Sequence, residues 1–277
     1  MENRKTISII GGTGQMGSIF ALAFKEKGHN VLIAGRNTTI SLEEAAKQGD
    51  IVIITVPIKV TLEVIKKIAP LIKKDSILID FTSVKKKPCE IMKKYSNCNV
   101  IGGHPLFGPK VKIPDQTFVL CPVKGNKTWE LKRILESIKL KVVIMTPEEH
   151  DKEMAIIQCM NQFSNIGFAK SLLENEFDLK KSDMFTPNFK LHLSVLGRTL
   201  SQNPELYPEI LIENPYSQET IKSFIKNLQN LNKMIKMGKE EKLEKEIIKL
   251  KEYFSTITEE SREITSKALE LMKKNDK

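Results

Sequence analysis

The most constraining feature of this chain is a glycine-rich segment that directly follows a short apolar run near the N-terminus. Residues 6–10 (TISII) are apolar and β-branched, which predicts a strand, and GGTGQMG follows at once. Apolar residues at helical spacing begin inside this segment and end near Gly28. A G-x-G-x-x-G motif between a strand and a helix favours dinucleotide binding, because its glycines permit a tight turn and a close approach of phosphates to the helix N-terminus. The expected cofactor contacts are Gly12, Thr13, Gly14, Gln15, Met16 and Gly17.

Apolar strand-like runs alternate with amphipathic helical patterns through the first half of the chain. Such alternation requires crossover connections and favours a parallel sheet that is covered on both faces. Residues 1–147 are therefore predicted to form an α/β domain, a Rossmann-type doubly wound parallel sheet. The predicted strands are residues 6–10, 30–34, 50–56, 76–81, 99–102, 117–121 and 141–145.

The second half, residues 148–277, is predicted to be all-helical. Strand-like runs nearly vanish after Pro147, and apolar residues recur at helical spacing in residues 148–174, 189–202, 218–236 and 239–273. Residues 240–256 combine charge pairs with a stripe of Ile, Leu and Phe. Helices of that kind lack partners in one small layer, so we expect this half to form a homodimer.

The net charge and the distribution of basic and apolar residues limit the kinds of partner that we expect for this chain. The formal net charge is +10 at pH 7, but the lysines are scattered, and arginines and aromatic residues form no cluster of the kind nucleic-acid binders use. We expect solvated lysines, including the Lys85–Lys87 triplet as a loop or helix start, and no nucleic-acid partner. No apolar stretch reaches about 18 residues and the N-terminal run is too short for a signal peptide, so we expect a cytoplasmic protein without a membrane span.

The cysteines give no sign of a metal site. Cys89, Cys98, Cys121 and Cys159 form no C-x-x-C pair and match no zinc spacing. We expect reduced thiols and no metal.

The end of the second strand bears on the choice of cofactor. An acidic residue there would bind the ribose 2′-hydroxyl of NAD, but the chain reads Ala34-Gly35-Arg36. Arg36 is suited to pair with a 2′-phosphate, which favours NADP and leaves NAD open. The alternative is an exposed arginine without a ligand.

Three further polar residues stand in contexts that favour chemistry. His104 lies between glycines and a proline after a strand, where a neutral imidazole accepts the proton of a substrate hydroxyl. Ser83, after another strand, either bonds His104 or the substrate hydroxyl, or caps a helix. Arg198 lies in an apolar helical segment, where a buried guanidinium needs a partner, either a substrate carboxylate or an internal glutamate.

Together these segments resemble the prephenate dehydrogenase family, and particularly the dehydrogenase part of bifunctional chorismate mutase/prephenate dehydrogenases. The resemblance runs from about Thr6 to the end of the chain. It rests on IIGGTGQMG, ITVPIKVT (54–61), IDFTSVK (79–85), GGHPLFGP (102–109), EEHDKEMAIIQ (148–158) and LGRTLSQNPELY (196–207). No chorismate mutase helices precede the glycine motif, so we expect the dehydrogenase activity alone.

The resemblance implies a reaction of tyrosine biosynthesis. The family oxidises prephenate, or the related arogenate, with NAD or NADP. A hydride leaves the ring carbon that bears the hydroxyl, the ring carboxylate is lost as carbon dioxide, and prephenate yields 4-hydroxyphenylpyruvate. The resemblance makes His104 catalytic with Ser83 beside it, and makes Arg198 the ligand of a substrate carboxylate. It further implies substrate contacts at Lys190, where relatives often carry arginine, and at Tyr207, and cofactor contacts at Val56, Pro57 and Thr82.

One departure from the family pattern concerns substrate choice. Gln162 takes the place of a histidine, and an amide cannot be protonated, so prephenate and arogenate both stay open. Two other classes of protein also remain open, namely another two-domain dehydrogenase or imine reductase and a non-catalytic dinucleotide sensor.

Overall fold

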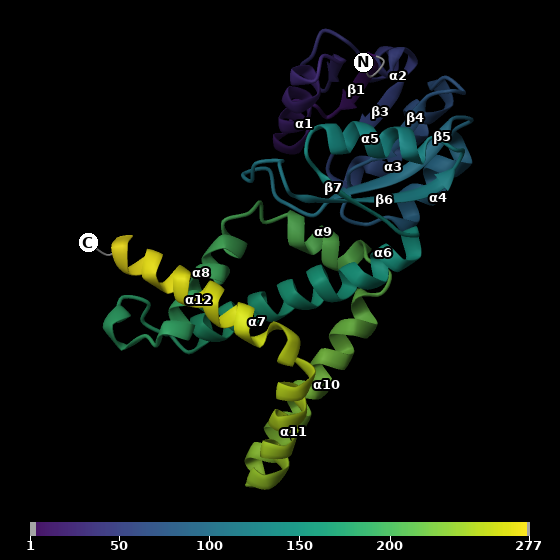
Figure 1. The fold of residues 1–277 in the computed structure, drawn as a ribbon. Helices are drawn as coiled ribbons and strands as arrows, with labels where there is room; N and C mark the ends of the chain where they lie inside the picture. Colours follow the sequence, from purple (N-terminus) through teal and green to yellow (C-terminus); the bar gives the residue numbers. More distant parts are fainter. Residues whose placement is uncertain (1–3, 276–277) are drawn as a thin grey trace. The chain divides into compact units, whose positions relative to one another are not determined.

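The computed structural model describes residues 4–275, apart from the side chains of residues 182 and 273–275 (Figure 1). The chain forms two compact units. One runs to Ala155 and includes Ile212–Tyr216, and the other holds Ile156–Leu211 and the chain from Ser217 onward.

The described part of the first unit contains one seven-stranded sheet with the order β2-β1-β3-β4-β5-β6-β7. Its strands are β1 (Thr6–Ile10), β2 (Asn30–Ala34), β3 (Ile51–Ile54), β4 (Ile77–Asp80), β5 (Asn99–Pro105), β6 (Thr117–Lys124) and β7 (Lys141–Ile144). The predicted doubly wound sheet is confirmed, but β6 runs antiparallel to β5. The segment between them contains no helix to make a crossover, so the chain returns in the opposite direction.

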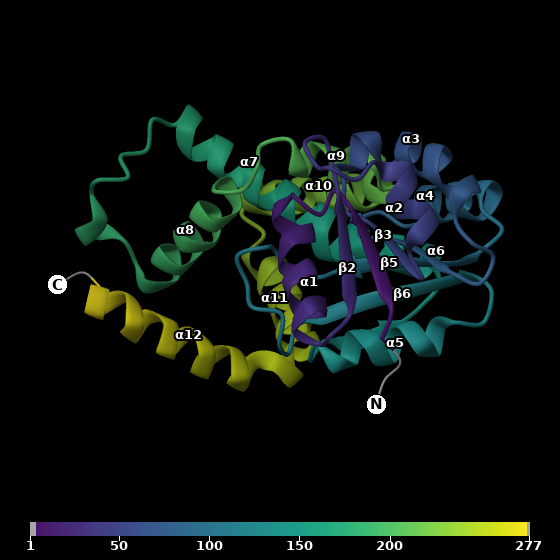
Figure 2. The same cartoon turned by 90° about the horizontal axis from the view of Figure 1, so that it is seen from above.

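Helices cover both faces of this sheet (Figure 2). The helices are α1 (Gln15–Glu26), α2 (Leu42–Gln48), α3 (Ile58–Ile68), α4 (Lys86–Tyr95) and α5 (Thr128–Ser137), with a 3₁₀ turn at Ala69–Leu71. On the face covered by α1 and α5, Phe20, Phe81 and Phe118 pack edge to face in a buried core. On the other face, Ile54, Ile65 and residues of α2 and α4 form a second core. The strands are nearly continuous apolar runs because they are buried on both faces.

Helix α6 (Pro147–Met154) belongs with the sheet, although the sequence pattern placed it in the helical half. A capping box between Thr146 and Glu149 starts it directly after β7. Its residue Asp151 accepts bonds from the start of α4, and the Asp151 carbonyl accepts a bond of 2.9 Å from Asn214 Nδ2. These bonds hold α6 and the segment Ile212–Tyr216 in the first unit.

The second unit is helical, as predicted. A π-helical turn (Ala155–Met160) leads into α7 (Asn161–Glu174), followed by a 3₁₀ turn (Ser182–Met184), α8 (Pro187–Leu200), α9 (Leu206–Glu213), α10 (Ser217–Lys236), α11 (Glu240–Tyr253) and α12 (Ser255–Asn275). The long helices expected over 148–174 and 239–273 are therefore each interrupted, by the π-helical turn and by a break after Tyr253. Aromatic contacts join these helices, such as Phe168 stacked on His192 with ring centroids 4.4 Å apart.

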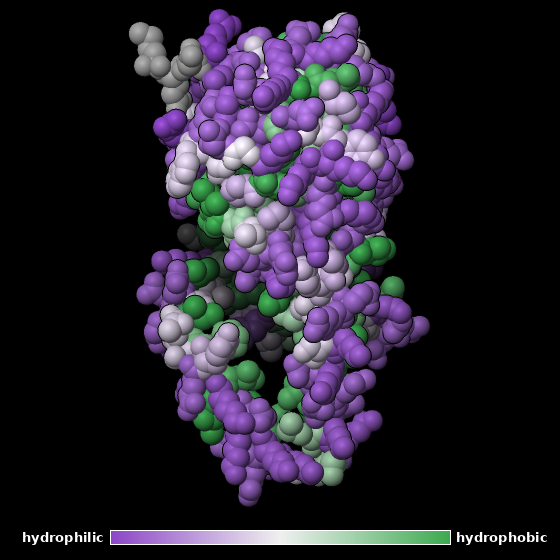
Figure 3. Space-filling view, turned by 90° about the vertical axis from the view of Figure 1, so that its right-hand side faces the viewer, coloured by the Kyte–Doolittle hydropathy of each residue, from purple (hydrophilic) through white to green (hydrophobic). Residues whose placement is uncertain are grey.

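Large apolar side chains remain exposed on the last three helices and at the break between α11 and α12. They include Ile225, Leu228, Ile235, Ile247, Ile248, Leu250, Phe254, Ile257 and Ile264. Figure 3 shows apolar residues in green among the hydrophilic residues of one face of the molecule. No helix in the described part of the chain is long and apolar enough to cross a membrane.

Candidate active site

The candidate active site lies at the carboxyl ends of the parallel strands. Ile10, Ile54, Asp80 and Gly102 lie in register across β1, β3, β4 and β5. The chain beyond this row carries the glycine motif, Val56 and Pro57, Thr82 and Ser83, and His104. Open α/β sheets bind ligands at this edge.

The glycine motif has the close-packed backbone that a dinucleotide cradle requires. A Cβ added to Gly17 would stand 2.7 Å from both the Gly11 carbonyl oxygen and the Gly12 Cα, and one added to Gly12 would stand 2.9 Å from the Ile9 carbonyl oxygen. Gly14 is the N-cap of α1, and no described side chain caps the first amides of this helix. Such a helix N-terminus receives phosphate groups, so the residues present fit a dinucleotide.

The segments after β2 and β3 adjoin this motif. The Gly11 amide donates to the Ala34 carbonyl oxygen at 2.7 Å, and exposed Arg36 follows two residues later. From the side of β3, Val56 Cγ1 lies 3.0 Å from where a Gly11 Cβ would stand, and Pro57 is the N-cap of α3. The structure thus brings these predicted residues together, and their contacts with a cofactor stay predictions.

A buried ion pair joins the ends of β4 and β5. Lys85 and Asp80 are both 0% exposed, and the Lys85 ammonium is paired with Asp80 Oδ2. The same ammonium donates to the carbonyl oxygen of Gly103 at 2.7 Å, next to His104. The expectation of a solvated lysine is therefore wrong for Lys85. A buried charge needs partners of this kind, and here they fix the backbone beside the histidine.

Thr82 and Ser83 lie in the turn that this ion pair holds. The Thr82 amide donates to Asp80 Oδ2 at 3.1 Å, and its hydroxyl bonds the same carboxylate and lies 2.8 Å from the Val84 carbonyl oxygen. Thr82 thus stabilises the turn, and its contact with the cofactor stays a prediction. Ser83 is half-buried, and its bond to His104 or to substrate also stays a prediction.

His104 begins a chain of buried polar contacts. It lies in β5 and is 2% exposed, and its Nδ1 is 2.8 Å from Nε2 of His150. His150 Nδ1 is 2.8 Å from Asp151 Oδ1. Asp151 also accepts the backbone amides of Lys85 and Lys86, at 2.8 and 2.9 Å, at the start of α4. Neither His150 nor Asp151 is among the residues predicted from the sequence, although the capping box after β7 was a signal for the helix that carries them.

These contacts favour one tautomer for each histidine. An ionised carboxylate is an acceptor only, so His150 donates to Asp151 from Nδ1. A neutral His150 then accepts at Nε2, which requires His104 to donate from Nδ1 and leaves His104 Nε2 as a proton acceptor.

Burial keeps both imidazoles neutral at pH 7. It lowers the pKa of His104 well below the ordinary value of 6.5, and the neighbouring His150 and Lys85 lower it further. Burial also lowers the pKa of His150, against a hydrogen bond to Asp151 that raises it. A neutral histidine at the same sheet edge as a dinucleotide cradle is suited to accept the proton of a hydroxyl while the carbon that bears this hydroxyl loses a hydride.

The residues predicted to bind substrate all belong to the helical unit. Arg198 is exposed, not the buried guanidinium expected, because α8 turns Leu196 and Thr199 inward instead. Tyr207 lies close to it. Burial raises the pKa of the Tyr207 hydroxyl, while the charge of Arg198 and a hydrogen bond with Thr199 lower it. The structure therefore brings Arg198 and Tyr207 together in one cluster.

Lys190 and Gln162 lie on two helices of the same unit. Lys190 is half-buried and precedes Arg198 on α8, and Gln162 lies in the first turn of α7. The Gln162 Oε1 atom is buried and has no hydrogen-bond partner among the described residues. A buried polar atom without a partner costs about 1–3 kcal/mol, which a bound ligand would offset. The placement of these four side chains toward His104 stays a prediction.

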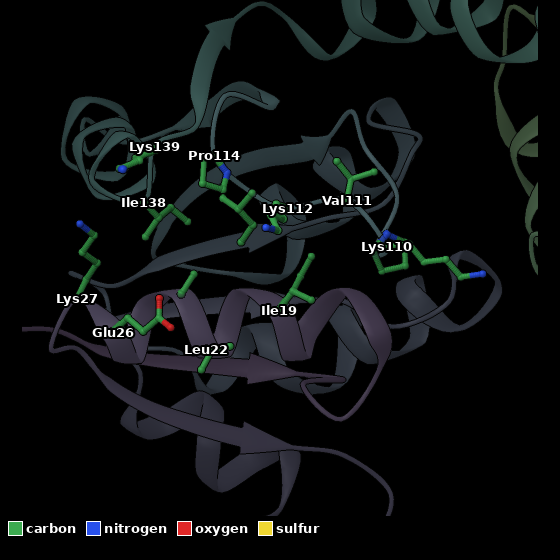
Figure 4. Close-up of a pocket in the computed structure, with 13 residues that line it drawn as sticks. Ile19, Leu22, Glu26, Lys27, Lys110, Val111, Lys112, Pro114, Ile138 and Lys139 are labelled. Atoms are coloured by element: carbon green, nitrogen blue, oxygen red, sulfur yellow. The ribbon is translucent and has the colours of Figure 1, made fainter. Parts of the chain in front are cut away.

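A cavity of about 680 Å³ lies elsewhere, between α1 and the loop that leads from β5 to β6 (Figure 4). Figure 4 shows Ile19 of α1 across from Val111 and Ile138. None of the predicted site residues lines this cavity, so it is separate from the row of strand ends.

The sequence matches two segments of one family. Residues 25–171 match "Prephenate dehydrogenase, nucleotide-binding domain" and residues 146–256 match "Prephenate dehydrogenase, dimerization domain". Together these matches span residues 25–256, which include most of both units.

Individual relatives agree with these matches. The "probable arogenate/prephenate dehydrogenase" of Methanocaldococcus jannaschii is 36% identical over 253 residues, which are 83% of this chain and 57% of the relative. The prephenate dehydrogenase of Lactococcus lactis subsp. cremoris is 30% identical over 257 residues, 82% of this chain and 70% of the relative. The chain thus spans less than two thirds of the length of the archaeal relative.

A solved structure supports the fold. The prephenate dehydrogenase of Aquifex aeolicus, in complex with hydroxyphenyl propionate and NAD⁺, superimposes with a TM-score of 0.74 at 22% identity, over 92% of this chain and 99% of that one. On the matches to its nucleotide-binding and dimerization domains, the chain belongs to the prephenate dehydrogenase family.

Proposed function

We propose that the chain catalyses the oxidative decarboxylation of prephenate, with NAD or NADP as hydride acceptor. The observation that carries this proposal is His104, a buried neutral imidazole whose Nε2 is a proton acceptor, at the strand edge that also carries the dinucleotide cradle. Family membership supplies the substrate class.

In this proposal one residue accepts a proton and others bind the carboxylates of the substrate. His104 Nε2 accepts the proton of the ring hydroxyl while the ring carbon that bears this hydroxyl loses a hydride. The carbon and the oxygen then form a C=O bond. The nicotinamide, when bound, supplies the acceptor of the hydride. As the ring carboxylate leaves as carbon dioxide and the ring becomes aromatic, the proton returns to the oxygen. Arg198 and Lys190 hold substrate carboxylates, and Tyr207, which is hydrogen-bonded to Thr199, lies near Arg198.

NADP is the favoured cofactor in this proposal. The segment after β2 holds an exposed arginine, Arg36, and no acidic residue before Ser41. A 2′-phosphate at this position would pair with the guanidinium, whereas a 2′-hydroxyl would lack its usual carboxylate partner.

Arogenate is a second candidate substrate, and one observation favours it. The buried Oε1 of Gln162 is an acceptor without a partner among the described residues. Arogenate carries an ammonium group where prephenate carries a keto oxygen, and an ammonium would donate to that atom.

The protein is further proposed to act as a cytoplasmic homodimer. The match to a dimerization domain and the exposed apolar side chains of α10, α11 and α12 support the dimer.

Initial rates of nicotinamide reduction, followed by absorbance with prephenate or arogenate and with NAD or NADP, test this function. We expect turnover with release of one carbon dioxide per reduced cofactor. Protein that binds a dinucleotide but turns over neither substrate would refute the assignment and favour a sensor or another dehydrogenase.

A further inference from the structure

The contacts of His104 lead inward to a second imidazole that the reaction described so far does not use. His150 is 0% exposed and lies between His104 and the carboxylate of Asp151, with both contacts at 2.8 Å. We propose that His150 is the second carrier in a two-proton relay, so that positive charge formed during oxidation rests on His150 beside Asp151. This inference rests on the proposed function, because it follows the proton that His104 accepts.

The relay step balances without any further reactant. The proton of the substrate O–H bond forms an N–H bond at His104 Nε2, and the electron pair of that O–H bond enters the new C=O bond. The Nδ1 proton of His104 passes to His150 Nε2. His104 is then neutral with its proton on Nε2, and His150 is an imidazolium. When the ring becomes aromatic, both protons move back and the oxygen regains its hydrogen.

The surrounding charges favour His150 over His104 as the site of the positive charge. Asp151 bonds His150 directly, and both Asp151 and, from the end of β4, Asp80 favour its charged form. Lys85, in the turn before α4, disfavours a charge on either histidine. For His104, the neighbouring His150 and Lys85 both disfavour the charged form and lower its pKa. The relay therefore moves charge from a poorly stabilised ring to one in contact with a carboxylate.

If His150 only oriented His104, it would not need to be able to take up a proton. Any acceptor would orient the Nδ1–H of His104. Here the acceptor is an imidazole, which takes up a proton, and the carboxylate behind it is itself held by two backbone amides. The same logic makes an aspartate stabilise the imidazolium that forms in a catalytic triad.

The first test reads the tautomers directly and needs no turnover. The chain has four histidines, so ¹⁵N resonances of the imidazoles in the intact protein are assignable by single substitutions. At pH 7 we expect His104 and His150 both to be neutral with the proton on Nδ1. A proton on Nε2 of neutral His150 would overturn the relay whatever the activity, because that nitrogen would then have no lone pair to receive the second proton.

The second test separates proton transfer from positioning. In His150→Gln, the amide oxygen reaches the place of Nε2 and accepts the His104 bond, but it cannot take up a proton. We expect kcat to fall about 10–100-fold, less than the loss of the base itself, with KM and dinucleotide affinity within about twofold. The proton inventory, which is the dependence of kcat/KM on the D₂O fraction of the solvent, should be curved in the wild type because two protons move. In His150→Gln it should become linear.

A matched control is His29→Asn, a buried histidine of the same unit whose Nδ1 accepts the Lys5 amide at 3.3 Å. It should keep the wild-type kcat and the curved inventory. Wild-type kcat in His150→Gln, or a linear inventory in the wild type, would refute the relay while leaving the proposed function in place. Absence of turnover in the wild type would refute the function, and the relay with it.

Discussion

Removal of one partner from the Lys85–Asp80 pair tests whether this ion pair holds the site together. Lys85→Met leaves the Asp80 carboxylate charged and fully buried. Breaking a buried pair in this way costs about 3–5 kcal/mol. The Gly103 carbonyl loses a donor at 2.7 Å as well, which adds about 1 kcal/mol. For a domain of this size 1 kcal/mol shifts the melting temperature by about 2–4 °C, so we expect a fall of roughly 10–20 °C.

Thermal unfolding followed by circular dichroism at pH 7 measures this fall. The double variant Asp80→Asn/Lys85→Met removes both charges and should recover at least half of the lost stability. Lys67→Met is the matched control, because Lys67 pairs with Glu43 at 2.7 Å but is 58% exposed, and it should cost at most about 1 kcal/mol. If Lys85→Met melted within about 2 °C of the wild type, or if the double variant were as unstable as the two single changes combined, the reasoning would be wrong.

Four further outcomes are expected. Gly17→Ala should weaken dinucleotide binding at least about tenfold in a fluorescence titration, because its Cβ would stand 2.7 Å from the Gly11 carbonyl oxygen; unchanged affinity would contradict the cradle. Arg36→Leu should raise the Kd for NADP about tenfold and leave that for NAD within about twofold, and equal effects on both would remove Arg36 from cofactor choice. The neutral form of His104 is the active base, and burial lowers its pKa. The value of kcat/KM should therefore be constant around pH 7 and fall with acid only below pH 6.5. A midpoint of this fall above pH 6.5 would argue against the buried base. Burial raises the pKa of the Cys121 thiol to about 12, so iodoacetamide at pH 8 should label Cys121 in urea but not in the native protein, as mass spectrometry would show.

The strands of the sheet could be predicted because strands buried on both faces appear as continuous apolar runs. The direction of β6 could not, because direction depends on how the chain between β5 and β6 returns, and that Gly/Pro segment has no periodicity to interpret. The interruptions of the helices at Ala155–Met160 and after Tyr253 could not be predicted for a related reason. Apolar spacing continues across them, while the break lies in the backbone.

The glycine motif and His104 could be predicted because each lies in a local context that its chemistry requires. The partners of His104 could not, because they come from distant parts of the chain. Asp151 bonds the Lys85 amide across 66 residues of sequence, and no local pattern pairs them. Lys85 itself was misinterpreted because lysine is a surface residue by default, and only the fold places Asp80 and the Gly103 carbonyl within its reach.

The central claim is that His104 Nε2 accepts a proton from the substrate, and His104→Asn tests it most directly. The asparagine amide keeps a donor near the position of Nδ1, toward His150, but has no atom at the position of Nε2. We predict that kcat with prephenate or arogenate falls about 10²–10⁴-fold while dinucleotide affinity stays within about twofold. An active wild type with an equally active His104→Asn variant would contradict the account.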